Sequence, residues 1–385
     1  MINVISAAMA ADDETVLEEA LVEFNELAEV EPHFFKPHFK DIYLKLKEIV
    51  MYPDFANAQI RHQPLEFCVS LVERMPSILK KDTELLKDLL DLIFKLMIDI
   101  DSDIDESWMR PKEGFSAEED EEDNVNFGKG CVDRLVSSLG DEIMMPLLGQ
   151  LVTTLVQNDT DWRYKHAGIM AFSQVGEYID SPDKIKAMIP IVEQHCTHPN
   201  PKIRFASLHC LGQVADDLNP EFQQQFHATT LPAIIACLDD SVPRVASHAC
   251  AALTNFAEGA DAEILLPYQQ GLAQKLLLLI KNNISICKEN AATALASVVE
   301  MTKEAFVPYF KETLQMLIQI LGEFHTSEYK QCRGQIIEAI TIICSAVGNE
   351  TFLPVANDVI RVLLEIQQNQ LESKDAQRIY LFSAW

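Results

Sequence analysis

The sequence is poor in the residues that interrupt helices. Of its 385 residues only 13 are glycine and 17 are proline, which excludes a collagen-like chain and argues against a sandwich of short strands joined by glycine-rich turns. It also has no C-x-x-C pair and no G-x-x-x-x-G-K-S/T, G-x-G-x-x-G or G-x-S-x-G motif. We therefore expect neither catalysis nor a cofactor.

Basic residues are also scarce. Lysine and arginine number 31 against 59 aspartates and glutamates, so the net charge is 31 − 59 = −28. Because a nucleic-acid binder needs positive charge to displace the counterions of phosphates, direct DNA or RNA binding is not expected. An anionic membrane would repel the chain as well. A basic partner would instead be attracted.

The nine cysteines are an odd number and fall mostly in apolar helical stretches, which favours a reducing compartment over a disulfide framework. His195, Cys196 and His198 lie close together but lack a fourth ligand with zinc spacing, so we expect no metal site. The first ten residues carry no basic region, and we read no signal peptide there. Uninterrupted apolar runs such as 276–280 are too short to cross a bilayer.

The chain repeats itself. Residues 165–176 align with residues 204–215 at an offset of 39, and residues 244–250 align with 204–210 at an offset of 40. Each copy follows an apolar helix and a short polar turn, and a helix–turn–helix unit of this period is typical of HEAT and armadillo repeats. We therefore predict an all-α fold, an α-α superhelix (solenoid) of HEAT repeats over residues 1–385, with about eight helix pairs. The predicted second helices are 13–30, 58–75, 126–139, 163–179, 203–217, 244–258, 284–301, 328–347 and 376–385.

Incomplete repeats are expected at both ends, because the first second helix has no partner before it and the last ends without a turn. The repeat is also interrupted by an acidic loop at 100–125. From residue 101 to 123 there are 11 acids and 2 bases. Such a run is expected to be solvated and mobile, either as a solubilising insertion or as a trap for a basic partner. Its residues of interest are Asp101, Asp103, Asp105, Glu106, Trp108, Glu118, Glu119, Asp120, Glu121, Glu122 and Asp123.

Several segments that follow the acidic loop carry a family resemblance. They are Asp-Trp-Arg-Tyr-Lys-His-Ala-Gly at 161–168, Gly-Gln-Val-Ala-Asp-Asp at 212–217 and Ala-Leu-Thr-Asn-Phe-Ala-Glu at 252–258. Together with the loop they resemble the karyopherin beta (importin beta) family, in particular its importin beta-3 branch, from about residue 12 onward. The resemblance implies a receptor that shuttles between cytoplasm and nucleus through the nuclear pore. Its implied partners are basic cargo proteins, the Ran GTPase and FG nucleoporins.

Import cargo is bound through lysine and arginine, so its receptor needs carboxylate and amide oxygens on the inner, second helices. Acids recur near the ends of these helices, where they oppose the helix dipole. The resemblance assigns cargo-reading positions to Asp133, Glu177, Asp217, Asn255 and Glu300. Their in-register neighbours Asp216 and Glu258 join the candidate set. The alternative is that these acids are merely solvated.

Two tryptophans and three basic residues complete the candidates. Trp162 either packs at its turn or stacks on a lysine stem of the cargo. Trp108, among carboxylates, is of the kind that anchors a loop or a partner. Lys165, Arg204 and Arg244 start second helices beside turn acids and are expected to form a structural ladder, which Ile286 breaks. The competing function is a static HEAT scaffold that holds other proteins together.

Overall fold

The structure is a computed structural model that describes residues 2–55, 57–111, 123–324, 330–368, 371, 375 and 377–385. Within these ranges the secondary structure consists of helices and contains no strand. Contacts between helices divide the chain into two compact units, Met1–Ser102 with Ala117–Asp180 and Asp103–Ser116 with Ser181–Trp385. We call them unit 1 and unit 2, and we call the first and second helix of each repeat the A helix and the B helix.

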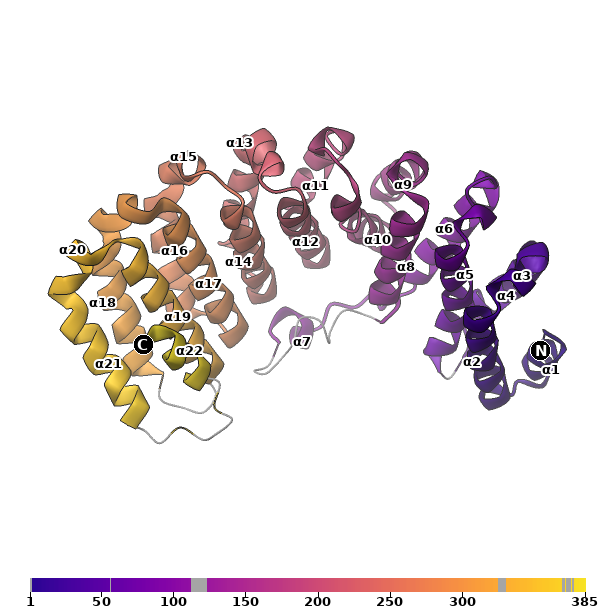
Figure 1. The fold of residues 1–385 in the computed structure, drawn as a ribbon, viewed down its shortest axis with the longest axis horizontal. Helices are drawn as coiled ribbons and strands as arrows, with labels where there is room; N and C mark the ends of the chain where they lie inside the picture. The colour runs from indigo at the N-terminus through magenta and orange to yellow at the C-terminus, as the bar shows by residue number, and fades with distance from the viewer. Residues whose placement is uncertain are drawn as a thin grey trace. The chain divides into compact units, whose positions relative to one another are not determined.

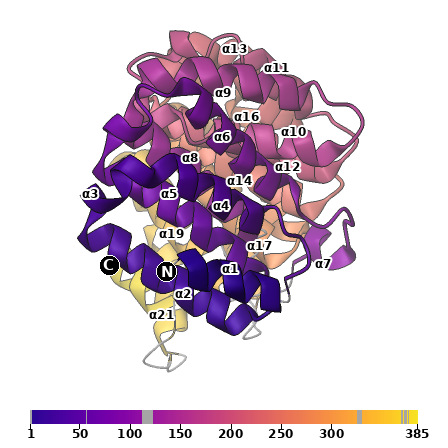
Figure 2. The same cartoon turned by 90° about the vertical axis from the view of Figure 1, so that its right-hand side faces the viewer.

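Unit 1 stacks successive A/B pairs, which face the viewer in Figure 2. Its A helices are α1 (Ile2–Ala11), α4 (Phe39–Val50), α6 (Thr83–Ile98) and α9 (Asp141–Val156). Its B helices are α2 (Glu14–Val30), α5 (His62–Arg74), α8 (Asp123–Leu139) and α10 (Trp162–Phe172). Short elements connect them: α3 (Pro32–Phe35), η1 (Lys36–His38), η2 (Ala58–Arg61), η3 (Pro76–Ile78) and η4 (Gly176–Tyr178).

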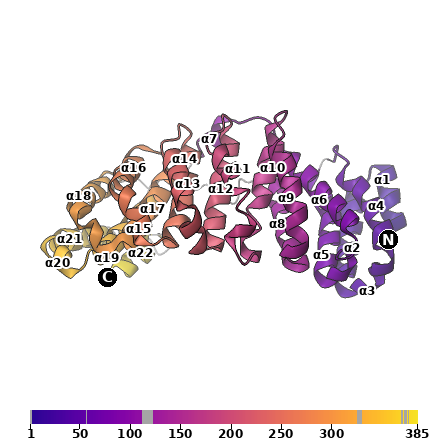
Figure 3. The same ribbon diagram turned by 90° about the horizontal axis from the view of Figure 1, so that it is seen from above.

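Unit 2 repeats the arrangement (Figures 1 and 3). Its A helices are α11 (Ile189–His195), α13 (Glu221–Cys237), α16 (Gln269–Asn282), α18 (Val307–Glu323) and α21 (Ala356–Gln368). Its B helices are α12 (Pro201–Asp217), α14 (Pro243–Glu258), α17 (Ser285–Thr302), α19 (Lys330–Ala346) and α22 (Gln377–Ala384). The remaining elements are α7 (Glu106–Met109), η5 (Pro182–Lys184), α15 (Ala262–Leu265), η6 (Leu266–Tyr268), η7 (Lys303–Phe306), α20 (Asn349–Phe352) and η9 (Leu353–Val355).

The B helices form the centre of each unit because they are packed on several sides. In unit 2, α12 contacts α14, α14 contacts α17 and α17 contacts α19, while each also packs on its own A helix. A helix enclosed in this way needs apolar and small residues on most of its surface. In α14, for example, residues 243–247 are all buried. The alternation of A and B helices is the all-α solenoid arrangement that the repeat predicts.

Three expectations about the ends of elements were wrong. The helix α2 does have a helix before it, because α1 packs against it. The B helix α10 ends at Phe172 instead of residue 179, and residues 176–178 form the short helix η4. Asp123 is the first residue of α8 and so belongs to a helix, not to the acidic loop. Apolar periodicity does not register the tightening of a last turn or the exact start of a helix.

The close approach of α12 and α14 depends on Gly212. A Cβ at this position would lie 3.0 Å from Ala252 Cα and 3.2 Å from Ala252 Cβ. We expect Gly212→Val to destabilise unit 2 by about 1–3 kcal/mol, because a larger side chain forces the helices apart. Urea denaturation followed by circular dichroism measures this.

The matched control for this substitution is Gly271→Ala in α16, where an added Cβ meets no atom within 4 Å. It should stabilise the protein by about 0.5–1 kcal/mol through helix propensity. Equal stabilities of the Gly212→Val protein and the original protein would contradict the close packing of α12 on α14.

Candidate functional site

The first turns of the B helices hold buried cations that bond to the end of the preceding A helix. Lys165 Nζ donates to Val156 O at 2.6 Å, and Lys288 Nζ donates to Ile280 O at 3.1 Å. Arg333, which is half-buried, likewise donates to Phe324 O. The last carbonyls of a helix have no partner within it and carry partial negative charge, so a cation there satisfies and stabilises them. These cations fix the turn between the two helices of a repeat.

The predicted ladder of turn carboxylates is present only in part. Lys165 pairs with Asp159 at 2.8 Å as expected. Arg204 pairs with the turn acid Asp240, which belongs to the next turn along the chain, and Arg244 Nη1 donates to Trp108 O at 3.5 Å. Ile286 stands where the ladder is expected to break, and Lys288, two positions later, donates to the backbone carbonyl oxygens of Ile280 and Lys281. Sequence alignment alone does not distinguish a contact within a turn from one between neighbouring turns.

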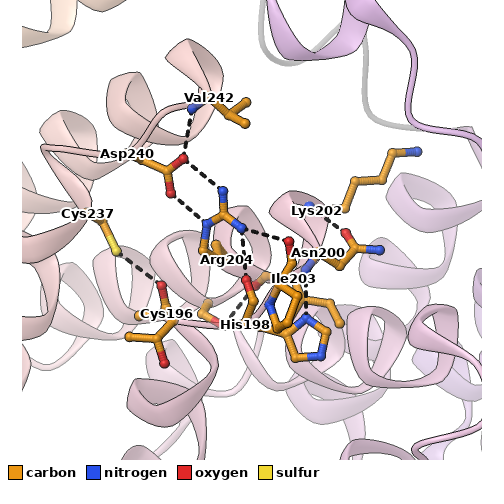
Figure 4. A network of polar contacts seen from close by, with 12 residues as sticks. Cys196, His198, Asn200, Lys202, Ile203, Arg204, Cys237, Asp240 and Val242 are labelled. Carbon is orange, nitrogen blue, oxygen red and sulfur yellow. Dashed lines mark hydrogen bonds and ion pairs between the residues drawn. The ribbon is translucent and has the colours of Figure 1, made fainter.

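Figure 4 shows the network around Arg204. Its Nε and Nη2 donate to the two oxygens of Asp240 at 2.6 and 2.8 Å, and Nη1 donates to His198 O at 2.8 Å. Asp240 also accepts the backbone N–H of Val242 at 2.8 Å. This bidentate pair joins two successive turns of unit 2, and its role is structural.

The other ends of the B helices in unit 2 carry the candidate carboxylates. Asp216, Glu258 and Glu300 are exposed and lie in the last turns of α12, α14 and α17. Because these helices pack side by side in this order (Figures 1 and 3), their ends lie along one edge of the unit. Packed helices are about 8–10 Å apart, which is close to the length of three residues of extended chain.

The remaining candidates of unit 2 are held by neighbouring side chains and backbone. Asp217 accepts from Gln213 Nε2 at 2.8 Å, and Asn255 Nδ2 donates to Gly212 O at 3.3 Å. Glu258 accepts from Ser297 Oγ at 3.2 Å, which links α14 to α17. The row thus combines exposed carboxylates with polar side chains that are fixed by bonds within a helix or between adjacent B helices. Ser297 was not found from the sequence, because only the lateral packing of α17 on α14 brings it to Glu258. Gln213 was overlooked, although its four-residue spacing from Asp217 on α12 is the signal that could have found it.

Unit 1 contains the other three candidates. Asp133 of α8 accepts the hydroxyl of Tyr178 at 2.8 Å, and exposed Glu177 precedes that tyrosine in η4. Burial, the bond to Asp133 and the two acidic charges raise the pKa of Tyr178 to about 12. Tyr178 therefore stays protonated and remains a hydrogen-bond donor at neutral pH. Glu177 was expected at the end of a B α-helix and instead lies in the short helix η4.

Trp162 is the first residue of α10 and is half-buried. Its ring meets the imidazole of His166 edge to face, with centroids 5.8 Å apart. This contact agrees with the packing interpretation.

The described part of the acidic loop combines exposed acids with one anchored turn. Residues 106–109 form α7, which is capped by Asp105 through a 2.7 Å bond from Trp108 N. Trp108 packs on α12 and α14, and Pro111 is buried. Asp101, Asp103 and Glu106 are exposed, which agrees with the solvated run that was predicted, whereas the anchoring of the indole was not predicted from charge. Glu118, Glu119, Asp120, Glu121 and Glu122 lie outside the described residues.

Neither a metal site nor a membrane span is found within the described ranges. No group of three or more histidine, cysteine or acidic residues in them is arranged to hold a metal ion. His195 Nδ1 instead bonds to Ile191 O at 2.7 Å, and His198 Nδ1 accepts from Asn200 N at 3.0 Å. All nine cysteines are buried, and none of them forms a disulfide. Among the helices described, none is both long and apolar enough to cross a membrane.

Comparisons with known proteins bear on the repeat and on the fold. A family model described as an importin repeat matches residues 54–146, and one described as a HEAT repeat matches residues 188–218. The chain is 29% identical to importin subunit beta-3 of Saccharomyces cerevisiae over 376 residues, which covers 95% of this chain and 33% of that protein.

Two solved structures extend the likeness to the fold. Kap121p bound to Pho4p and Kap121p bound to Nup53p each match with a TM-score of 0.89 and 27% identity. Both matches cover 100% of this chain, and they cover 37% and 36% of Kap121p. The chain therefore has the HEAT-repeat solenoid fold predicted from its period and spans about a third of the length of these relatives.

Proposed function

From the likeness to importin subunit beta-3 and Kap121p, we propose that the chain belongs to the importin beta family, is part of a nuclear import receptor and binds lysine- and arginine-rich targeting signals along its B helices. In unit 2 the signal would lie across the C-terminal ends of α12, α14 and α17. The observation that carries this proposal is the row of exposed carboxylates Asp216, Glu258 and Glu300 on three adjacent helices.

The chemistry of the row matches an extended basic peptide. A carboxylate holds an ammonium or a guanidinium by charge-assisted hydrogen bonds. Neighbouring helix axes are about 8–10 Å apart, so a cation about every third residue of an extended peptide meets one carboxylate per repeat. The acids also oppose the helix dipole at these ends, a local cost that an incoming cation would offset.

Asp133, Glu177 and Trp162 of unit 1 are proposed to bind the same kind of signal. There Tyr178 holds Asp133 at 2.8 Å and leaves Glu177 exposed. A half-buried indole such as that of Trp162 offers a face on which a lysine stem can stack. Asp217 and Asn255 take part in unit 2 as positioned oxygens.

Release of cargo by Ran-GTP, contact with FG nucleoporins and shuttling between cytoplasm and nucleus are further parts of the proposal. Their support is the likeness to Kap121p, which has been solved with Pho4p, Nup53p and Ulp1p. The same likeness favours an import receptor over the static HEAT scaffold, and it agrees with a role that is not enzymatic.

The test is a titration of this chain with a fluorescent lysine-rich peptide at increasing salt. Since exposed charges are screened over a Debye length of about 10 Å at 0.1 M and about 3 Å at 1 M, the affinity should fall by about tenfold or more over this range. A glutamate-rich peptide of equal length is the control and should not bind. Affinity that is insensitive to salt and also to Glu177→Ala with Asp217→Ala would refute the proposed site.

A further inference from the structure

The contacts of Trp108 define a second site, at the opposite ends of the same helices. Two cations lie near its indole: Arg244 Cζ is 4.8 Å and Lys202 Nζ is 5.8 Å from the ring centroid. Phe205 meets the indole edge to face, with centroids 5.9 Å apart and an interplanar angle of 72°. We call Lys202, Phe205 and Arg244 the notch.

The notch is built for an aromatic side chain with carboxylates near it. Its three residues are only 6%, 5% and 3% exposed with Trp108 in place. A desolvated cation over an indole face is one of the stronger cation–π arrangements. The backbone also takes part, since Arg244 Nη1 donates to Trp108 O at 3.5 Å. The residues of the notch therefore contact the indole ring, place positive charge near its electron-rich face, and bond to the backbone of Trp108.

The segment that fills the notch has the form of a short peptide ligand. Asp105 accepts from Trp108 N at 2.7 Å and from Ser107 Oγ at 2.9 Å, so it caps α7 and fixes the backbone that carries the indole. Those bonds, with the positive charge of Lys202 as a lesser contribution, keep the pKa of Asp105 low. Residues 103–116 are grouped with unit 2, although the chain on either side of them belongs to unit 1.

From these contacts we infer that the notch is a peptide-binding site for acidic segments containing tryptophan, which this chain fills reversibly with its own residues 105–111. The site is separate from the proposed cargo row. On α12, Lys202 precedes Asp216 by 14 residues, and on α14, Arg244 precedes Glu258 by 14 residues. Each separation is about 20 Å along the helix axis. The notch is proposed to bind an acidic peptide, whereas the cargo row is proposed to bind a basic one. Either proposal can therefore be refuted without affecting the other.

A direct test uses the full chain and a fluorescent peptide that copies residues 103–111. In the original protein the internal segment competes at an effective concentration of about 1 mM, so a site with a dissociation constant of about 10 μM is masked about 100-fold. We expect Trp108→Ala to raise the affinity for the added peptide at least about tenfold. The gain should disappear when Arg244→Met is added, or when the peptide carries alanine in place of tryptophan.

A second measurement does not need the emptied notch to stay folded. Chymotrypsin cleaves after tryptophan, and docking protects the bond after Trp108. Lys202→Met or Arg244→Met should speed this cleavage about tenfold, because each keeps an apolar stem but removes the cation. Arg361→Met removes an exposed arginine of α21 and should leave the rate unchanged.

Two results would overturn the inference. One is a Trp108→Ala chain with unchanged thermal unfolding that binds the added peptide no better than the original protein does. The other is cleavage after Trp108 at the same rate in the Arg244→Met, Lys202→Met and Arg361→Met proteins.

Discussion

Changing Asp216, Glu258 and Glu300 to lysine is expected to lower the affinity for a lysine-rich peptide by about 100-fold. An exposed ion pair contributes roughly 0.5 kcal/mol, and replacing an attraction by an equal repulsion doubles the change. Three positions then give about 3 kcal/mol, which corresponds to about two orders of magnitude in the dissociation constant. All three side chains are exposed, so the effect falls on binding and not on folding.

The control for this variant must have the same net charge. Glu263, Glu312 and Glu365 are exposed acids on α15, α18 and α21, away from the B helices. Their change to lysine alters the net charge by the same amount. It is expected to weaken binding by no more than about threefold, because only the long-range attraction between the chain and the peptide changes and salt screens that attraction. Anisotropy titrations at one salt concentration compare the two. An equal loss of affinity in both variants would mean that the peptide responds to the net charge of the chain and not to the row of Asp216, Glu258 and Glu300.

Replacing Asp240 by alanine is expected to destabilise the turns between α11 and α14 by about 3–5 kcal/mol. The side chains of Arg204 and Asp240 are only 14% and 7% exposed, so removal of the carboxylate leaves a buried guanidinium without its counter-charge. Two bonds from Arg204 and one from Val242 N are lost together. Hydrogen exchange of the amides of α12 and of the first turn of α14 reports the lowered opening free energy.

The neighbouring residue gives a matched control. Asp239 pairs with Lys275, but its side chain is 65% exposed. Asp239→Ala is therefore expected to cost no more than about 1 kcal/mol, although it removes the same charge. The double variant with Arg204→Met and Asp240→Ala should recover much of the lost stability, because no buried charge is then left alone. If Asp240→Ala were as mild as Asp239→Ala, the pair would contribute little to the turn.

Much of the fold could be predicted from the sequence because one repeat is a local object. A helix, a turn and a second helix fit in about forty residues, and the basic start of each B helix recurs at offsets of 39 and 40. The acids near the B-helix ends could be predicted for the same reason, since position along a helix follows from position in the repeat. The exceptions are local adjustments of geometry, such as the ending of α10 at Phe172 and the placement of Glu177 in η4.

Contacts between repeats were not predictable in the same way. The sequence alignment put Arg204 beside the acids of a turn, but it could not show that Asp240 of the next turn is its partner. Nor could it show that Ser297 holds Glu258 or that Tyr178 holds Asp133. These pairs depend on how far one helix is rotated and shifted against the next, which apolar periodicity leaves open.

By itself, then, the sequence determined the all-α solenoid, the excess of acid and the helix ends at which that acid recurs, because all three are properties of composition and period. Only the tertiary structure decided where Trp108 lies. Charge patterning made residues 101–123 look like a solvated run. The notch of Lys202, Phe205 and Arg244 exists only when α12 packs on α14, and its cations and aromatic ring hold the indole that the surrounding carboxylates would otherwise keep in water.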